Sequence, residues 1–411
     1  MSGALAGIRV CDFTGQLAGA GATRFLAAMG AQVIRVEDPV KQGRWDILRG
    51  TTPYVDDRRG IEFGGAFNNH NIEKLGVTIN LRTDEGKQLL RELIAISDVV
   101  AENFAAGVLA RLGFPYEEQR RIKPDIVYVS NSGFGHRGPY SAYRTWGPIV
   151  QAVCGLTFSS GVPDLPAAGW GYSYMDHHGG NFMAIAILAG LLHRRRTGEG
   201  QWIDMSCTDA GATLLGPLLL DATVNDRPLR RPGMPHSSHS QSPRMVPHNI
   251  YAARGDDEWI AIACRDDREW RALANVVDEP WARDPEYDTL DGRSAKEAVL
   301  DAALDQWCSV RDKFETQVLL QDAGVPAAAV QRPEERIEFD PATAAWGLWP
   351  MVHHREIGAV RVDGLPVHFS ETDWSIAHGA PCLGQHNDFV FGELLGHDAE
   401  QIARWREDGV L

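Results

Sequence analysis

The 411-residue chain has little of what marks several classes of protein, beginning with cysteine. Its six cysteines stand far apart, and none of them forms a CxxC pair or has the histidine spacing that is typical of a zinc site. Scattered cysteines are typical of a reducing compartment, so we expect a cytoplasmic protein that carries no metal.

Basic residues and long apolar runs are also scarce. Lysine and arginine total 40 against 55 aspartates and glutamates, which leaves a formal net charge of −15. No basic excess is present to attract nucleic-acid phosphates or an anionic membrane. The apolar stretch 182–192 is too short to span a bilayer, and the opening MSGALAGIRVCDFTG has no charged leader before an apolar run. We therefore expect no nucleic-acid partner, no membrane attachment and no export signal.

What the sequence does have is a regular alternation of strand and helix patterns. Apolar strands are predicted at 8–13, 31–37, 77–81, 99–103 and within DIVYVSNSGFG (125–135). Amphipathic helices separate several of them, for example over 84–97, and a long helix is predicted over 178–194. Strands separated by helices of this length predict a parallel sheet with right-handed crossovers, and hence an α/β fold.

The composition changes once, at 222–247, where Pro, Ser, His and Arg dominate and no periodicity is sustained. We read this segment as a linker. The predicted domains are accordingly a large domain over 1–221, a smaller α/β domain over 248–330, and a second linker with a C-terminal return to the large domain over 331–411.

A glycine-rich turn follows the first predicted strand, where dinucleotide-binding folds hold their cofactor. Gly19 and Gly21 form a GxG, but Arg24 stands where the third glycine would allow close packing. The turn therefore favours a tight strand-to-helix connection, and no nicotinamide cofactor is expected.

For several polar residues, the sequence pattern alone allows two different roles. Lys74, Asn103 and Arg111 lie near the ends of predicted elements, where they would either bind a diphosphate or be solvated surface groups. Asp176 stands at the start of the apolar helix, where it would serve either as the helix N-cap or as a reactive carboxylate.

Several blocks, in order along the chain, resemble the family III CoA-transferases, a group that includes formyl-CoA:oxalate and carnitine CoA-transferases and α-methylacyl-CoA racemase. The blocks are LAGIRVCDFTGQLAGAGATRFLAAMGAQVIRVEDP, NHNIEKLGVTINLRTDEGKQLLRELIAISDVVAENFAAGVLARLGF, KPDIVYVSNSGFGHRGPY, HRRRTGEGQWIDMSCTDA and PCLGQHNDFVFGELLG. The resemblance covers most of the chain and is weakest around 222–350.

The resemblance implies a fold, an assembly and a reaction. We expect a Rossmann-like large domain with a smaller α/β domain, in an open, ring-shaped chain that forms an interlocked homodimer or a heteromer with a related chain. We expect coenzyme A as co-substrate, with an acyl-CoA donor such as succinyl-CoA and a carboxylic acid acceptor.

The resemblance also gives Asp176 a role, because it matches the aspartate that attacks the thioester and carries the acyl group as a mixed anhydride. Exchange of CoA between two acids requires a carboxylate whose acyl derivative stays as reactive as the thioester. The backbone N–H groups of Gly179 and Gly180 are candidate oxyanion donors, and His177 or its neighbour His178 is a candidate for acid–base assistance.

The resemblance also assigns residues that contact CoA. Gln16, Leu17 and Ala18 match the loop beside the adenine and pantetheine of CoA. The other CoA-contacting positions are matched by Lys74, Asn103, Phe104, Arg111 and Arg144. Asp38 stands where some relatives carry an arginine beside the nucleotide.

Departures from the family pattern narrow the activity. Trp146 stands where the racemase branch carries a proton-moving histidine, which favours a transferase. Leu17 and Gly147 replace the Gln and Glu of formyl-CoA transferases, which predicts an acceptor larger than oxalate. Trp146, Trp170 and Tyr172 are candidates for its pocket, with core packing as the alternative.

Three other functions stay open at the level of the sequence. They are an acyl-CoA racemase or isomerase, a non-catalytic subunit of a heteromeric CoA-transferase, and a nicotinamide-dependent oxidoreductase. Incorporation of solvent deuterium, assay of the single chain and titration with NAD would distinguish them.

Overall fold

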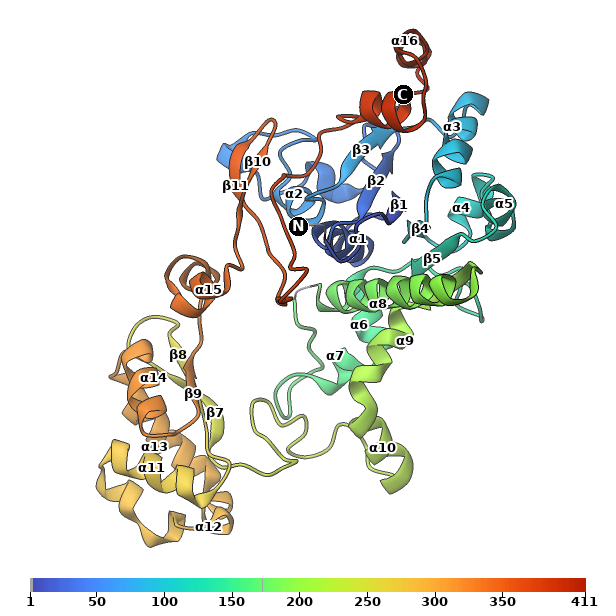
Figure 1. Ribbon diagram of the computed structural model, residues 1–411. Coiled ribbons are helices and arrows are strands. Elements are labelled where there is room, and N and C mark those ends of the chain that lie inside the picture. Colours follow the sequence, from blue (N-terminus) through green and yellow to red (C-terminus); the bar gives the residue numbers. More distant parts are fainter. Residues whose placement is uncertain (1–2, 172) are drawn as a thin grey trace. The chain divides into compact units, whose positions relative to one another are not determined.

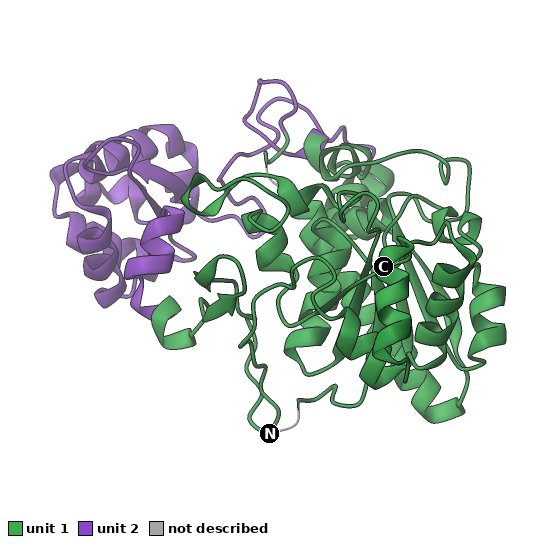
Figure 2. Cartoon of the chain, turned by 90° about the horizontal axis from the view of Figure 1, so that it is seen from above, with its two compact units in different colours: residues 1–157, 169–225, 343–411 green, residues 158–168, 226–342 purple. Residues whose placement is uncertain are grey.

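The structure is a computed structural model that describes residues 3–171 and 173–411. The chain forms two compact units (Figure 2). Unit 1 contains residues 1–157, 169–225 and 343–411, and unit 2 contains residues 158–168 and 226–342. The C-terminal segment therefore belongs to the same unit as the N-terminal half of the chain.

Unit 1 is built on a six-stranded parallel sheet with the strand order β3-β2-β1-β4-β5-β6. Its strands are β1 (Arg9–Phe13), β2 (Gln32–Glu37), β3 (Leu75–Thr78), β4 (Val99–Glu102), β5 (Val127–Ser132) and β6 (Gln201–Ser206). This is the strand order of a Rossmann fold, in which the direction of winding reverses between β1 and β4. The predicted Rossmann-like α/β fold is confirmed, while the interlocked dimer stays a prediction.

Helices cover both faces of this sheet (Figure 1). On one face, α1 (Ala18–Ala28) and α8 (Tyr174–Thr197) pack Leu26, Met183 and Ile187 against the strands. On the other face lies α3 (Asp84–Ala95), and α16 (Ala399–Glu407) adds Ile402 and Trp405 to the same core. Because β1 to β5 are largely buried on both sides, most of them contain short apolar runs in the sequence, whereas the edge strand β6 is only partly buried.

The remaining elements of the N-terminal part are short. They are α2 (Gly65–His70), α4 (Val108–Arg111), α5 (Tyr116–Ile122), α6 (Gly147–Val153), α7 (Leu156–Ser159), α9 (Cys207–Ala212) and α10 (Gly216–Asn225). In the C-terminal part, α15 (Pro341–Trp346) precedes the hairpin of β10 (Met351–His354) and β11 (Gly358–Arg361). A π-helix, Asp388–Leu394, then packs Phe391 into the same core as α3.

Unit 2 has its own core and a small antiparallel sheet. The sheet consists of β7 (His248–Ala252), β8 (Trp259–Ala263) and β9 (Ala327–Ala329), in that order. Its helices are α11 (Asp267–Val277), α12 (Leu290–Ala295), α13 (Glu297–Ser309) and α14 (Lys313–Asp322). Trp270, Leu273 and Leu304 are fully buried between sheet and helices.

A buried ion pair lies beneath the carboxyl end of β1. The Lys74 ammonium is 3.1 Å from Asp12 Oδ2, and both side chains are inaccessible to solvent. Lys74 also donates hydrogen bonds to Thr23 Oγ1 at 2.7 Å and to Asn71 Oδ1 at 3.0 Å. Burial lowers the pKa of Lys74 to about 8, although the negative charge of Asp12 acts to raise it. Lys74, which was predicted to contact CoA, is thus an internal group that joins β1, α1 and the segment before β3.

Two further buried arginines hold the loop that follows β2. Arg35 on β2 pairs with Asp46 at 2.8 Å, and Arg49 pairs with Glu37 at 2.6 Å. All four side chains are inaccessible to solvent. Paired in this way, the charges fix the loop between β2 and α2 against the edge of the sheet where the strands end.

We expect the substitution Lys74→Met to destabilise the protein strongly, because it leaves the Asp12 carboxylate buried without its counter-charge. Breaking a buried pair in this way costs about 3–5 kcal/mol of unfolding free energy. Urea denaturation followed by tryptophan fluorescence measures the change. The exposed Arg111→Ala is the control and should change stability by no more than about 0.5 kcal/mol. A Lys74→Met protein with wild-type stability would contradict the structural role of this pair.

Candidate active site

A cavity of about 290 Å³ opens in unit 1 where the winding of the sheet reverses. Its walls come from the segments that follow β1, β4 and β5, from the start of α6 and from the first turn of α8. The predicted site residues that line it are Gln16, Ala18, Asn103, Phe104, Arg144, Trp146 and Asp176. Ligands of open α/β sheets bind at this switch point, outside the carboxyl ends of the strands.

Asn103 ties together the two strands that flank the switch point. Its Oδ1 accepts a hydrogen bond from Gly15 N at 2.7 Å, and its Nδ2 donates to Gly15 O at 3.0 Å. With both ends of its amide used in this way, Asn103 shapes the wall of the cavity, and its neighbour Phe104 supplies an apolar surface.

Asp176 lies in the first turn of α8. The helix begins at Tyr174 after the N-cap Ser173, so Asp176 occupies the third helical position. The alternative in which Asp176 is the N-cap is therefore wrong. Burial raises the pKa of the Asp176 carboxyl, and a hydrogen bond from the Ser173 side chain opposes that rise. The positive end of the helix dipole also favours the carboxylate here.

The space for this carboxylate depends on Gly147, the first residue of α6. A Cβ atom at position 147 would lie 2.3 Å from Asp176 Oδ2, closer than atoms approach in real structures. In this chain, Gly147 therefore leaves the room that the Asp176 carboxylate occupies.

Gly179 and Gly180 lie one turn after Asp176 and are buried. A Cβ at 179 would lie 2.6 Å from Cys207 Sγ, and one at 180 would lie 2.8 Å from Ala18 O. Only the first four N–H groups of a helix lack a partner inside it, and both glycines lie beyond that point. The structure thus gives them a packing role in place of the predicted oxyanion role, because their N–H groups belong to the ladder of α8.

The two histidines after Asp176 point elsewhere. His177 lines a second cavity together with Leu17, and its ring lies 5.8 Å from that of His70, measured between centroids. His178 Nε2 lies 3.0 Å from Ala210 O. Neither histidine lines the cavity that contains Asp176, so the predicted acid–base assistance from His177 has no geometric support.

Of the other predicted site residues, some line the cavity that contains Asp176 and others lie away from it. Arg144 is an exposed residue at the cavity wall, whereas Arg111 is exposed on α4 with its guanidinium 3.5 Å from Ala106 O. Trp146 lines the cavity and is half exposed. Trp170 is half exposed and packs against Tyr174. Tyr172 lies outside the described residues.

Several residues of this site were not predicted from the sequence. Asn131 at the end of β5 and Cys207 at the start of α9 both line the cavity, and Cys207 Sγ donates to Asn131 Oδ1 at 3.0 Å. Trp45 packs edge-on against Phe104 with ring centroids 5.0 Å apart. Asn131 follows the same strand-end rule that predicted Asn103, but nothing in the local sequence marks Cys207 or Trp45.

An adjoining cavity of about 250 Å³ shares Trp45 and Phe104 with the first. It lies at the carboxyl ends of β1, β2 and β3, and Asp38, Lys41 and Arg82 line it. The cationic side chains of Lys41 and Arg82 suit an anionic ligand group, whereas the negative charge of Asp38 would repel one.

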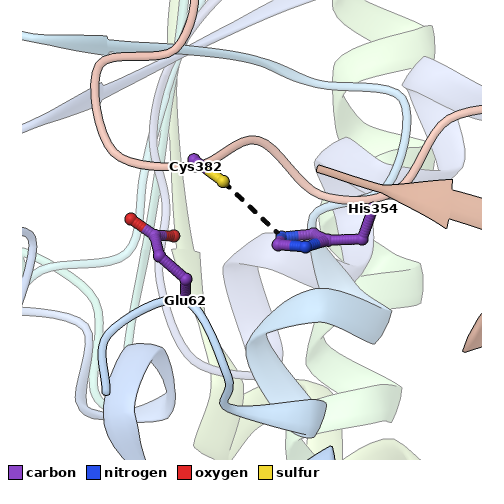
Figure 3. A group of neighbouring side chains, drawn as sticks. All are labelled: Glu62, His354 and Cys382. Atoms are coloured by element: carbon purple, nitrogen blue, oxygen red, sulfur yellow. Dashed lines mark hydrogen bonds between the residues drawn. The ribbon is translucent and has the colours of Figure 1, made fainter. Parts of the chain in front are cut away.

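A cluster of Glu62, His354 and Cys382 brings potential metal ligands within 4.8 Å of one another (Figure 3). Two backbone N–H groups donate to His354 Nδ1 at 3.2 Å, so the ring proton sits on Nε2, which faces Cys382 Sγ at 4.0 Å. Glu62 pairs with Arg49 at 2.7 Å, and burial raises the pKa of the Cys382 thiol to about 12. Because Glu62 and His354 Nδ1 already have partners and the Cys382 thiol is protonated, we interpret the cluster as a structural contact. That the reaction uses no metal stays a prediction.

Comparison with known proteins agrees with this architecture. Residues 5–387 match the family model described as CoA-transferase family III. The chain is 30% identical to a succinyl-CoA–D-citramalate CoA-transferase of Chloroflexus aurantiacus, over 98% of this chain and 97% of that protein. It is 33% identical to an acetyl-CoA:oxalate CoA-transferase of Acetobacter aceti, over 96% of each chain. A crystal structure of a CaiB/BaiF family protein from Brucella suis has a TM-score of 0.84 at 28% identity and covers 96% of this chain and 100% of that one.

The chain belongs to CoA-transferase family III. It is a transferase whose substrates are an acyl-CoA and a carboxylic acid, with CoA as the group exchanged between them. Within residues 3–171 and 173–411, no helix combines the length and apolar character that a membrane crossing requires.

We expect Gly147→Ala to lower kcat by roughly 100-fold, because the added methyl group displaces the Asp176 carboxylate by about an ångström. Steady-state assay of CoA transfer measures the loss. Gly216→Ala on α10 is the matched control, since a Cβ there meets no atom within 4 Å. Equal activity of the two variants would show that the carboxylate does not need this space.

The raised pKa of Asp176 predicts an acid limb in the pH profile of kcat/KM. The reactive form is the carboxylate, so activity is complete above the raised pKa and is lost as the pH falls through it, at a pH above the ordinary value of 3.8. Ser173→Ala removes a hydrogen bond that lowers this pKa, so it should move the limb to higher pH. A limb that stays in place or moves down in this variant would contradict the assignment.

Proposed function

We propose that this enzyme moves CoA from an acyl-CoA donor, such as succinyl-CoA, to a carboxylic acid acceptor through an acylated Asp176. The observation that supports this is the position of Asp176, whose carboxylate faces the switch-point cavity in the first turn of α8. The Cys207 thiol also lines this cavity, but burial raises its pKa to about 12, so it is protonated at neutral pH.

The reaction starts when a carboxylate oxygen of Asp176 attacks the thioester carbon. A C–O bond forms, the C–S bond breaks, and the electron pair leaves with the CoA thiolate, which gives a mixed anhydride. The thiolate then attacks the aspartyl carbonyl and releases the donor acid, leaving an aspartyl–CoA thioester. The acceptor carboxylate displaces CoA again as a new anhydride, and a last attack by the thiolate releases the acceptor thioester and restores Asp176.

The paired cavities support an orientation for CoA. Its thiol end fits the cavity that holds Asp176, and its phosphates fit the adjoining cavity, where Lys41 and Arg82 supply positive charge. The pantetheine arm would pass Trp45 and Phe104, which both cavities share. Arg144 is placed at the wall beside Asp176 and could pair with a substrate carboxylate.

The acceptor would carry an apolar portion. Trp146 and Val150 line the cavity beside Asp176, which supports an acid larger than oxalate. Among relatives of similar identity, one is named for citramalate and another for oxalate, so identity alone does not choose the acid.

We expect Asp176→Asn to fold normally and to lose CoA transfer, because an amide nitrogen cannot carry the acyl group as an anhydride. Incubation with a panel of acyl-CoA thioesters, trapping with hydroxylamine and mass spectrometry should place the label on position 176 of the wild type. The exposed Asp209→Asn on α9 is the control and should be labelled like the wild type. An active Asp176→Asn enzyme, or label at another residue, would refute the mechanism.

A further inference from the structure

We propose that Asn131 donates the hydrogen bond that stabilises the oxyanion formed on the carbonyl of acylated Asp176. This inference rests on the proposed function of Asp176. It concerns the steps in which CoA thiolate or the acceptor carboxylate attacks the aspartyl group, a group that belongs to the protein and is the same for every substrate.

The amide of Asn131 is held in one orientation. It is 2% exposed at the end of β5, and its Oδ1 accepts a hydrogen bond from Cys207 Sγ at 3.0 Å. A protonated thiol is a donor, so it selects the oxygen of the amide as its partner. Burial and the nearby charge of Asp176 both keep Cys207 protonated. The Nδ2 group is thereby turned away from Cys207.

That Nδ2 group is a donor without an acceptor. It is buried, and no atom among the described residues 3–171 and 173–411 accepts a hydrogen bond from it. Buried amide donors are nearly always paired, and those that are not commonly serve a bound group. Asn131 lines the cavity that contains Asp176, so the missing acceptor is expected from a group that enters this cavity during the reaction.

The position of the donor relative to α8 suits this role. Nδ2 lies 3.9 Å from where a Cβ of Gly179 would stand. Gly179 is three residues after Asp176, so the two share one face of the helix. The amide therefore lies in ordinary contact with the face of α8 that carries Asp176.

The chemistry needs a donor at this point. Attack on the aspartyl carbonyl forms a bond from sulfur or oxygen to the carbonyl carbon, and the C=O electron pair moves onto oxygen. When the C=O bond re-forms, that pair returns and the leaving group departs with its own electrons, so the donor gives up no proton. The backbone N–H groups of Gly179 and Gly180 are committed to α8, whereas the buried Nδ2 group of Asn131 has no acceptor among the described residues and is free to stabilise the transient charge.

Rapid-quench mass spectrometry separates this role from a structural one. In the wild type, Asp176 should first gain the mass of the acyl group and then that of CoA. In Asn131→Asp, which keeps the acceptor for Cys207 but lacks the N–H group, the acyl adduct should form normally. The CoA adduct should then form roughly 100-fold more slowly, as expected for loss of one oxyanion donor. Asn131→Leu removes the same donor without adding charge and should show the same split.

Asn181→Asp, an exposed change on α8, controls for added charge and should form both adducts at the wild-type rate. Wild-type formation of the CoA adduct in both Asn131 variants would overturn the proposal, as would an equal loss of both adducts, which marks a structural role. If the wild type itself carries no adduct on Asp176, the proposed function fails, and that result is distinct from a failure at Asn131.

Discussion

The close contact between α8 and the start of α1 is the constraint on which the site depends. At Gly180 the backbone of α8 lies so near Ala18 O that no side chain fits, and at Gly179 the same is true against Cys207. These contacts bring the first turn of α8 to the reversal point of the sheet, where the loops after β1 and β4 already meet through Asn103. Asp176 reaches the cavity because the helix that carries it can approach this closely.

Buried ion pairs hold the part of the cavity wall that contains Trp45. Asp12 with Lys74, and Arg35 with Asp46, are taken fully out of water, and such pairs hold only when both partners are present. They join β1, α1 and the loop after β2, which also carries Trp45. Lys74, a cationic side chain near the carboxyl ends of the strands, is thus held inside the protein by Asp12.

The fold class and most strands could be predicted from the sequence because these strands contain short apolar runs and helices separate them along the chain. The strand predicted over 8–13 is found at Arg9–Phe13, and the one predicted over 31–37 at Gln32–Glu37. The start of α8 was placed too late, since GWGYSYMDHHGG is rich in glycine and lacks a clear helical period. For the same reason Asp176 looked like a cap.

Contacts between residues far apart in the sequence could not be predicted from local sequence patterns. Lys74 meets Asp12, and Cys207 meets Asn131, only because the sheet brings their elements together. No periodicity or spacing encodes such pairs. Asn103 was found because the family pattern names it and the strand-end rule supports it, and Phe104 because the family pattern names it. Trp45 depends on a loop path that only the structure provides, whereas Asn131 follows the strand-end rule and was missed.

The buried thiol of Cys207 has a consequence for chemical selectivity. A sulfur anion beside an activated acyl group would capture it as a dead-end thioester on the enzyme, since thiolates outcompete carboxylates as nucleophiles. Burial, with the charge of Asp176, raises the pKa of this thiol to about 12. In the proposed reaction, the charge of the Asp176 carboxylate thus helps to keep the competing Cys207 thiol protonated and unreactive. Once Asp176 is acylated its charge is gone, and burial alone keeps the thiol from being acylated.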